Sequence, residues 1–176
     1  LIANGKAKPF IIVMANSYVP GANVPAPGGG PGRRMFDFSA FSRVLTDDLI
    51  PFVDANFRTL SDQPNRAMAG LSMGGMQTRG ITLANLDKFS HIGIFSGGSI
   101  ALTNITDLAA FKRQVKLVFV SYGGRENSTV AKANVEELRQ AGITSFFYES
   151  PETGHEWQTW RRSLYRFAPL LFQDGP

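Results

Sequence analysis

The 176-residue sequence contains no cysteine, which excludes disulfide bonds, thiolate metal sites and a cysteine nucleophile. No apolar run approaches the roughly 20 residues that a transmembrane helix needs, so we expect no membrane span and no membrane partner. Charged residues make up only 18% of the chain, and the net charge of +4 comes from scattered lysines and arginines. Scattered basic residues favour a solvated surface, and we expect no nucleic-acid partner.

Apolar residues make up 43% of the chain. They occur in two kinds of segment that take turns along the sequence. Short continuous apolar runs predict strands at residues 9–15, 66–71, 90–95, 116–121 and 143–149. Helical spacing predicts helices over residues 36–57, 75–86, 108–112, 128–141 and 156–171, with a kink or a second start at Pro51. This alternation is typical of an α/β fold with a mainly parallel sheet flanked by helices. The length fits a single domain over residues 1–176.

Residues 16–34 are rich in proline and glycine and predict a long irregular loop. Such a loop is either functional or a disordered insert, and the sequence leaves both open. Its glycine triplet, residues 28–30, lacks the lysine and the helix of a phosphate-binding loop, and we expect no cofactor. No cluster of His, Asp and Glu has metal-ligand spacing, so we expect no metal either.

The most specific motif is the G-x-S-x-G pentapeptide at residues 70–74, between a predicted strand and a predicted helix. A sharp strand-to-helix turn lifts the hydroxyl of Ser72 out of the sheet, and flanking glycines permit that turn. We therefore interpret Ser72 as a nucleophile and the N–H of Met73 as an oxyanion donor. The alternative is a glycine-rich turn with an incidental serine.

A serine nucleophile needs a base, and the chain has only two histidines. His155 follows the last predicted strand, at the end where catalytic groups gather in open α/β sheets, and we predict that it is the base. The alternative is a histidine at a helix start without a catalytic role. His91 begins a predicted strand and is expected to be a packed or capping residue.

The acid that orients the base should stand between Ser72 and His155 in the chain. Glu126 lies just beyond the end of a strong predicted strand, and it is our predicted triad acid. Glu152 is the rival. Arg125 could instead pair with Glu126 in a purely structural role.

Three segments carry a resemblance to a known family: GLSMGG at residues 70–75, DLIPFVDANFRT at residues 48–59 and GHEW at residues 154–157. Together they resemble the esterase D-type α/β-hydrolases, and most closely the family 1 carbohydrate esterases, which include feruloyl and acetylxylan esterases. The resemblance covers essentially the whole chain. It implies an α/β-hydrolase fold and a secreted bacterial serine esterase that removes feruloyl or acetyl groups from plant xylan. Feruloylated or acetylated xylan would be the partner, and xylanase or binding modules could be fused to the domain.

Residue by residue, the resemblance assigns the nucleophile to Ser72 and the base to His155. Glu126 stands where the family usually has aspartate. Family members also have further strands before the segment that resembles residues 1–16, and one of them lies between the counterparts of 9–15 and 66–71. We therefore expect this chain to be a segment of a larger domain that lacks its first strands, or to pair with a second piece.

Substrate-contacting residues are expected near the mouth of this site. The candidates are Asn16, Ser17, Tyr18, Gln77, Trp157 and Trp160. The two tryptophans could stack on a sugar or a phenolic ring, although tryptophans three residues apart on a helix also suit core packing. Three other functions stay open: an S-formylglutathione hydrolase-like enzyme, a mycolyltransferase-like enzyme, and a non-catalytic glycan-binding relic of the fold.

Overall fold

The computed structural model describes residues 1–17, 19 and 38–173. The chain forms two compact units. The smaller unit comprises residues 11–60, and the larger unit comprises residues 1–10 and 61–176. Most of the predicted loop at 16–34, including Tyr18, lies outside the described residues.

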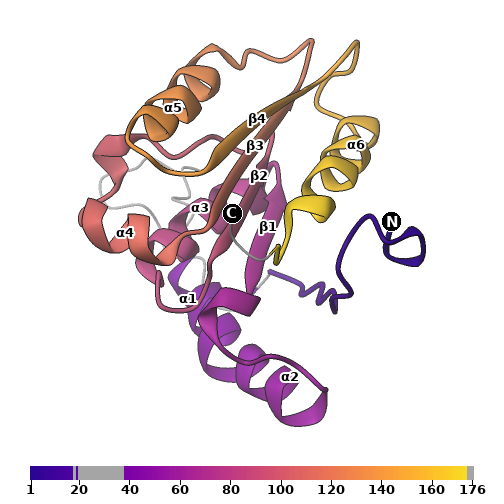
Figure 1. The fold of residues 1–176 in the computed structure, drawn as a ribbon, viewed down its shortest axis with the longest axis vertical. Coiled ribbons are helices and arrows are strands. Elements are labelled where there is room, and N and C mark those ends of the chain that lie inside the picture. The colour runs from indigo at the N-terminus through magenta and orange to yellow at the C-terminus, as the bar shows by residue number, and fades with distance from the viewer. Residues whose placement is uncertain (18, 20–37, 174–176) are drawn as a thin grey trace, which may run out of the picture. The chain divides into compact units, whose positions relative to one another are not determined.

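The larger unit is built on a four-stranded parallel sheet with the strand order β1-β2-β3-β4 (Figure 1). The strands are β1 (Ala67–Leu71), β2 (His91–Phe95), β3 (Leu117–Gly123) and β4 (Ser145–Ser150). The helices are α3 (Met73–Ala84), α4 (Leu108–Gln114), α5 (Thr129–Gln140) and α6 (Trp157–Phe167). Short 3₁₀ turns occupy Ile2–Asn4, Gln63–Asn65, Leu102–Asn104 and Ala168–Leu170. The four strands and four helices predicted for this unit are confirmed, with ends that differ by a few residues.

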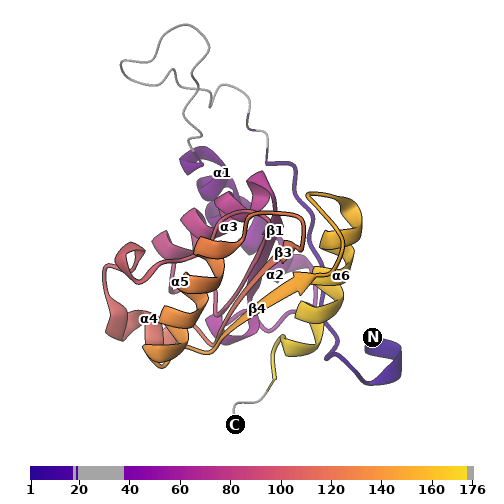
Figure 2. The same ribbon diagram turned by 90° about the horizontal axis from the view of Figure 1, so that it is seen from above.

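Helices cover both faces of the sheet because alternate strand residues point to opposite sides. Ile94 and Val120 belong to a buried cluster with Phe111 of α4 and Leu138 of α5. Their strand neighbours on the other face belong to a second cluster, which includes Phe167 of α6. Figures 1 and 2 accordingly show α3, α4 and α5 on one side of the sheet and α6 on the other. The carboxyl ends of all four strands therefore meet along one open edge.

In the smaller unit, the predicted long helix divides into three segments. They are α1 (Ser39–Arg43), a π-helical segment (Val44–Leu49) and α2 (Ile50–Asn56). The N–H of Ile50 donates to the carbonyl of Leu45, five residues back, and Pro51 occupies the first turn of α2. Proline lacks an N–H and is tolerated in a first helical turn, so the second helix start expected at Pro51 is confirmed.

The strand predicted at residues 9–15 is wrong, because the structure forms no strand there. A strand exists only when a neighbour accepts and donates its backbone hydrogen bonds. Among the described residues, the four strands of the larger unit pair only with one another. The apolar side chains of residues 11–14 are consequently exposed, and Met14 is 92% exposed.

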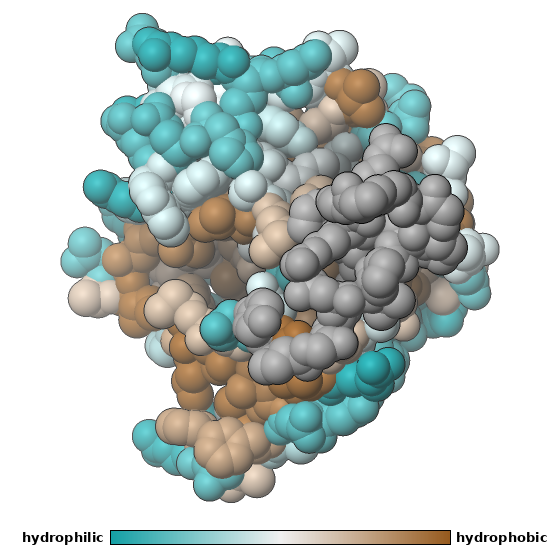
Figure 3. All heavy atoms as spheres, turned by 180° about the vertical axis from the view of Figure 1, so that it is seen from behind, coloured by the Kyte–Doolittle hydropathy of each residue, from teal (hydrophilic) through white to brown (hydrophobic). Residues whose placement is uncertain are grey.

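Further apolar side chains of the smaller unit are exposed as well, including Phe52, Phe57 and Leu60. Apolar residues also reach the surface on the face that Figure 3 shows. Within the described ranges, no helix combines the length and the hydropathy that a membrane crossing requires.

Candidate active site

Ser72 occupies the sharp turn between β1 and α3, with φ 52° and ψ −119°. A positive φ is uncommon for a residue with a side chain. The turn also requires Gly70, because a Cβ there would lie 2.1 Å from the carbonyl oxygen of Gly74. Gly74 has open space around its Cα, so the steric argument for the motif's second glycine does not apply.

A third glycine, which the sequence analysis missed, supports the same turn from the next strand. A Cβ on Gly97 would lie 2.5 Å from the carbonyl oxygen of Ser72 and 2.6 Å from the Cα of Gly75. The start of α3 therefore packs backbone-to-backbone against the segment that follows β2. Its sequence signal is the Gly97-Gly98 pair directly after a predicted strand.

Three side chains from three different strand ends form a continuous row of hydrogen bonds. Nε2 of His155 lies 2.8 Å from Oγ of Ser72. Nδ1 of the same ring lies 2.8 Å from Oε1 of Glu126. These residues follow β1, β3 and β4, whose carboxyl ends lie at one edge of the parallel sheet.

The carboxylate in contact with His155 is that of Glu126, and Glu152 lies in the turn that follows β4. The other oxygen of Glu126, Oε2, accepts hydrogen bonds from the N–H of Gly123 and the hydroxyl of Ser96, both at 2.7 Å. Both carboxylate oxygens therefore have partners other than Arg125.

The surroundings of Glu126 favour its charged form. Burial alone would raise the pKa of this carboxyl, since its side chain is only 13% exposed. The hydrogen bonds from Gly123, His155 and Ser96, together with the charge of His155, outweigh burial and hold the pKa below its usual value. Glu126 is therefore ionised at neutral pH and suited to stabilise an imidazolium.

The backbone N–H of Met73 is the first of α3. The first N–H groups of a helix have no partner within the helix, and the helix dipole adds positive potential at this end. An oxyanion that forms at Ser72 would therefore meet a suitable donor at this position.

His91, the other histidine, is packed as expected: it is 2% exposed and remote from this row. Its Nδ1 lies 2.7 Å from Oγ of Ser90, and its Nε2 accepts the N–H of Phe172 at 3.2 Å. Burial, with a smaller contribution from the charge of Lys116, lowers the pKa of His91 to about 4. It is a neutral core residue at physiological pH.

The predicted substrate-contacting residues have different locations. Trp157 is 70% exposed and packs edge-on against Trp160, with ring centroids 5.2 Å apart. Gln77 lies on the buried side of α3 and is 6% exposed. Asn16 and Ser17 belong to the smaller unit, so the structure does not place them relative to Ser72.

Trp160 contacts the row of hydrogen bonds itself. Its ring lies edge-on to His155, with centroids 5.0 Å apart. Its indole N–H donates to Oγ of Ser96 at 3.2 Å. Ser96 was not predicted from the sequence, because nothing in its local pattern shows that it faces a carboxylate thirty residues away.

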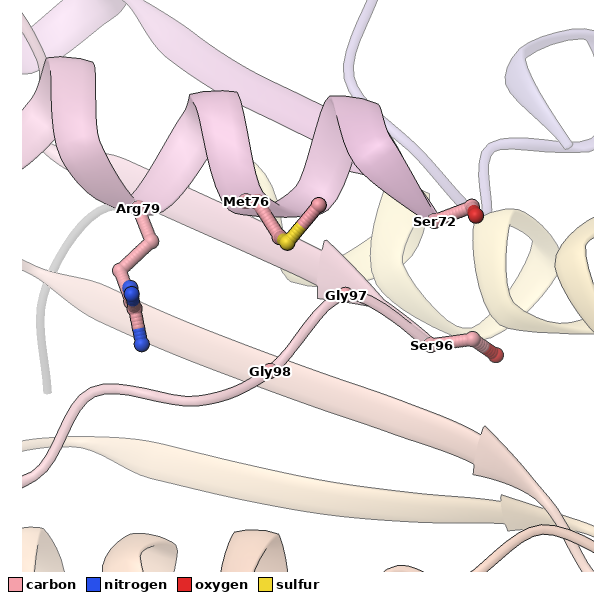
Figure 4. A pocket seen from close by; sticks show the side chains of 6 residues that line it. All are labelled: Ser72, Met76, Arg79, Ser96, Gly97 and Gly98. Atoms are coloured by element: carbon pink, nitrogen blue, oxygen red, sulfur yellow. The ribbon is translucent and has the colours of Figure 1, made fainter. Parts of the chain in front are cut away.

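A pocket of about 240 Å³ adjoins the serine (Figure 4). It is lined by Ser72, Met76, Arg79, Ser96, Gly97 and Gly98. Met76 lies four residues after Ser72, and Arg79 lies three residues after Met76. This spacing places all three along one side of α3. Elsewhere in the described part of the chain, no group of three or more His, Asp or Glu side chains could hold a metal ion.

Comparison with known proteins identifies the family. A family model with the description "Putative esterase" matches residues 2–171. The chain belongs to this esterase family. It is also 44% identical, over 173 residues, to an endo-1,4-beta-xylanase/feruloyl esterase of Xylanibacter ruminicola. That match covers 98% of this chain, and the chain spans 22% of the length of that relative.

Solved structures confirm the predicted α/β-hydrolase fold of this member of the esterase family. A CE1 ferulic acid esterase of Anaeromyces mucronatus matches with a TM-score of 0.73 and 20% identity, over 97% of this chain and 68% of that chain. An S-formylglutathione hydrolase of Staphylococcus aureus matches with a TM-score of 0.55 and 16% identity, over 72% of this chain and 61% of that chain. At these identities the likeness concerns the fold alone.

Proposed function

We propose that this protein is a serine carboxylic-ester hydrolase that removes feruloyl groups, or alternatively acetyl groups, from plant xylan. The observation that carries the proposal is the row Ser72–His155–Glu126, in which both hydrogen bonds measure 2.8 Å. Membership of the esterase family and the strained turn at Ser72 support the same conclusion.

The reaction proceeds by acyl transfer in two halves. Oγ of Ser72 attacks the ester carbonyl while His155 takes the hydroxyl proton, and the N–H of Met73 binds the oxyanion that forms. The ester bond then breaks, and His155 gives its proton to the departing sugar hydroxyl. Water, deprotonated by His155, attacks the acyl-enzyme; the bond to Oγ then breaks, His155 returns the proton to Oγ of Ser72, and the carboxylic acid leaves. Glu126 holds the ring in the required tautomer and offsets the imidazolium charge in both halves.

The pocket beside Ser72 favours a feruloyl over an acetyl group. Its volume of about 240 Å³ is larger than an acetyl group needs. Met76 offers an apolar contact for the acyl chain, and Arg79 offers hydrogen-bond donors at the far end. Arg79 lies roughly 10 Å beyond Ser72 along the helix axis, a reach that suits an extended aromatic acid.

Feruloylated xylan in the plant cell wall is the polymer that we propose as substrate. Support comes from the relative in Xylanibacter ruminicola, whose name combines a xylanase with a feruloyl esterase. Exposed Trp157 could stack on a sugar ring of the polymer next to the ester. A polymeric substrate outside the cell requires a secreted enzyme, and fused xylanase or binding modules would keep it at the polymer.

Hydrolysis of methyl ferulate by the wild-type protein and by Ser72→Ala tests this function. We expect turnover in the wild type and a loss of at least about 10³-fold in the variant, with unchanged circular dichroism. p-Nitrophenyl acetate, measured in parallel, separates a feruloyl from an acetyl preference. Turnover that survives in Ser72→Ala would overturn the proposed nucleophile.

The alternatives are separated by adding a sugar acceptor, a glutathione thioester and xylan to the same comparison. A mycolyltransferase-like enzyme would pass the acyl group to a sugar acceptor instead of water. An S-formylglutathione hydrolase-like enzyme would prefer the thioester. A glycan-binding relic would bind xylan and hydrolyse neither ester.

A further inference from the structure

The row of hydrogen bonds does not end at the proposed acid. Oε2 of Glu126 accepts the hydroxyl of Ser96 at 2.7 Å, and Oγ of Ser96 accepts the indole N–H of Trp160 at 3.2 Å. We infer that Ser96 is a positioning residue, which holds the Glu126 carboxylate toward His155, and that Trp160 fixes the direction of the Ser96 hydroxyl. This inference rests on the proposed function.

The two oxygens of Glu126 have separate partners. Oε1 faces Nδ1 of His155, while Oε2 is held by Ser96 and by the N–H of Gly123. A glutamate has one more rotatable bond than an aspartate, so its carboxylate needs more support to keep one orientation. Two donors on Oε2 provide that support from two different strands, since Ser96 follows β2 and Gly123 ends β3.

The backbone of Ser96 is itself fixed. Its N–H donates to the carbonyl of Ser121 at 2.7 Å, and the residue is 8% exposed. Its φ of 49° lies in the left-handed region, which a serine adopts at a cost when its surroundings require it. The position therefore combines a rare backbone conformation with a hydroxyl that contacts the triad carboxylate, as strained residues at functional sites do.

Trp160 explains why the Ser96 proton points at Glu126. A serine hydroxyl has one proton and two acceptor lone pairs, and an indole N–H can only donate. Because Trp160 donates to Oγ, the contact uses a lone pair and leaves the hydroxyl proton for Oε2. The same indole ring packs edge-on against His155, so Trp160 contacts both His155 and Ser96.

Ser96 also lines the pocket beside Ser72, so a direct role in substrate binding is the competing explanation. The two roles affect different kinetic constants. Loss of a substrate contact would raise KM, whereas loss of carboxylate positioning would lower kcat and leave KM in place.

A double-mutant cycle on methyl ferulate hydrolysis tests the positioning role. We expect Ser96→Ala to lower kcat about 10-fold with KM unchanged, because it removes a hydrogen bond to a charged group. In the Glu126→Ala background the same substitution should change kcat less than about 2-fold, because the group through which Ser96 acts is absent. Equal losses in the two backgrounds would show that Ser96 acts through the fold instead.

The variant Trp160→Phe extends the cycle. Phenylalanine keeps an aromatic ring beside His155 but has no N–H to donate to Ser96. We expect kcat to fall about 3-fold in the wild type and to change little when residue 96 is already alanine. A loss of the same size in both backgrounds would assign the effect to the smaller ring beside His155 and overturn the role of the indole N–H.

Titration of Glu126 by carboxyl-selective NMR provides a readout that needs no activity. A hydrogen bond to the charged form lowers a carboxyl pKa, so Ser96→Ala should raise the pKa of Glu126. The matched control is Ser99→Ala, which removes another buried hydroxyl, one that bonds Asn134 at 2.9 Å and not Glu126. An unchanged Glu126 pKa in Ser96→Ala would overturn the inference.

These readouts separate failure of the inference from failure of the proposed function. A wild-type protein that hydrolyses no ester would refute the function, while the titration would still test the contact of Ser96 with Glu126. An active wild type with additive losses in the cycle would refute the positioning role and leave the function standing.

Discussion

At the scale of single residues, the mechanism depends on which carboxylate faces His155. Replacement of Glu126 by glutamine keeps the shape of the side chain but removes the charge that stabilises an imidazolium. We expect Glu126→Gln to lower kcat by about 10³–10⁴-fold, the size of effect known for the acid of a serine triad. Steady-state hydrolysis of methyl ferulate measures it.

Glu152→Gln is the matched control, because Glu152 is the rival candidate for the acid and lies in the turn between β4 and His155. Its activity should stay within about 2-fold of the wild type, as is usual for surface substitutions. The opposite pattern, with the loss in Glu152→Gln, would transfer the role of the acid to Glu152.

Three residues of this row could be predicted from local sequence rules. Ser72 has a motif with strand–turn–helix context, His155 is one of two histidines, and Glu126 follows a strand end in the required chain order. Ser96 has no such signal, because its contact with Glu126 exists only once β2 and β3 lie side by side. Residues that meet through strand pairing are not visible in a local pattern.

At the scale of elements, the turn at Ser72 depends on close packing between α3 and the segment after β2. In Gly97→Ala the new Cβ would lie 2.5 Å from the carbonyl oxygen of Ser72, so the start of α3 must shift. We expect the free energy of unfolding to fall by about 1–3 kcal/mol, as overpacking does. Urea denaturation measures the free energy, and kcat should fall as well because the shift moves Ser72.

Gly74→Ala provides the comparison, since a Cβ at Gly74 meets nothing within 4 Å and alanine favours a helix. We expect this variant to unfold at the same or a higher urea concentration than the wild type. If Gly97→Ala were as stable as the wild type, the close approach between the start of α3 and the segment after β2 would not exist in solution.

At the scale of the whole molecule, the parallel sheet could be predicted because its strands are continuous apolar runs separated by helical patterns. Buried strands of this kind need apolar side chains on both faces, and both faces of β2 and β3 are indeed buried. The segment at residues 9–15 has the same composition but no pairing partner among the described strands. Composition therefore predicts the tendency to form a strand, and pairing decides the outcome.

The packed histidine at the start of β2 makes the stability of the whole unit depend on pH. The pKa of His91 is about 4 in the folded protein, compared with 6.5 for an unperturbed histidine. Above pH 6.5 the group is neutral in both states and full stability is present. As the pH falls from 6.5 towards 4, the unfolded chain binds a proton that the folded state excludes, so stability is lost. The difference amounts to about 3 kcal/mol over this range.

Urea unfolding of the wild type at several pH values between 7 and 4 measures this loss, and His91→Gln provides the control. Glutamine does not titrate, so the part of the slope that belongs to His91 should disappear in the variant, whatever its stability at pH 7. The carboxyl of Glu126 also loses its contribution in acid, but only as the pH falls through its lowered pKa, below the range in which His91 begins to act. The difference in slope between the two proteins from pH 6.5 to 5 therefore isolates His91, and parallel slopes there would show that His91 accepts its proton without unfolding.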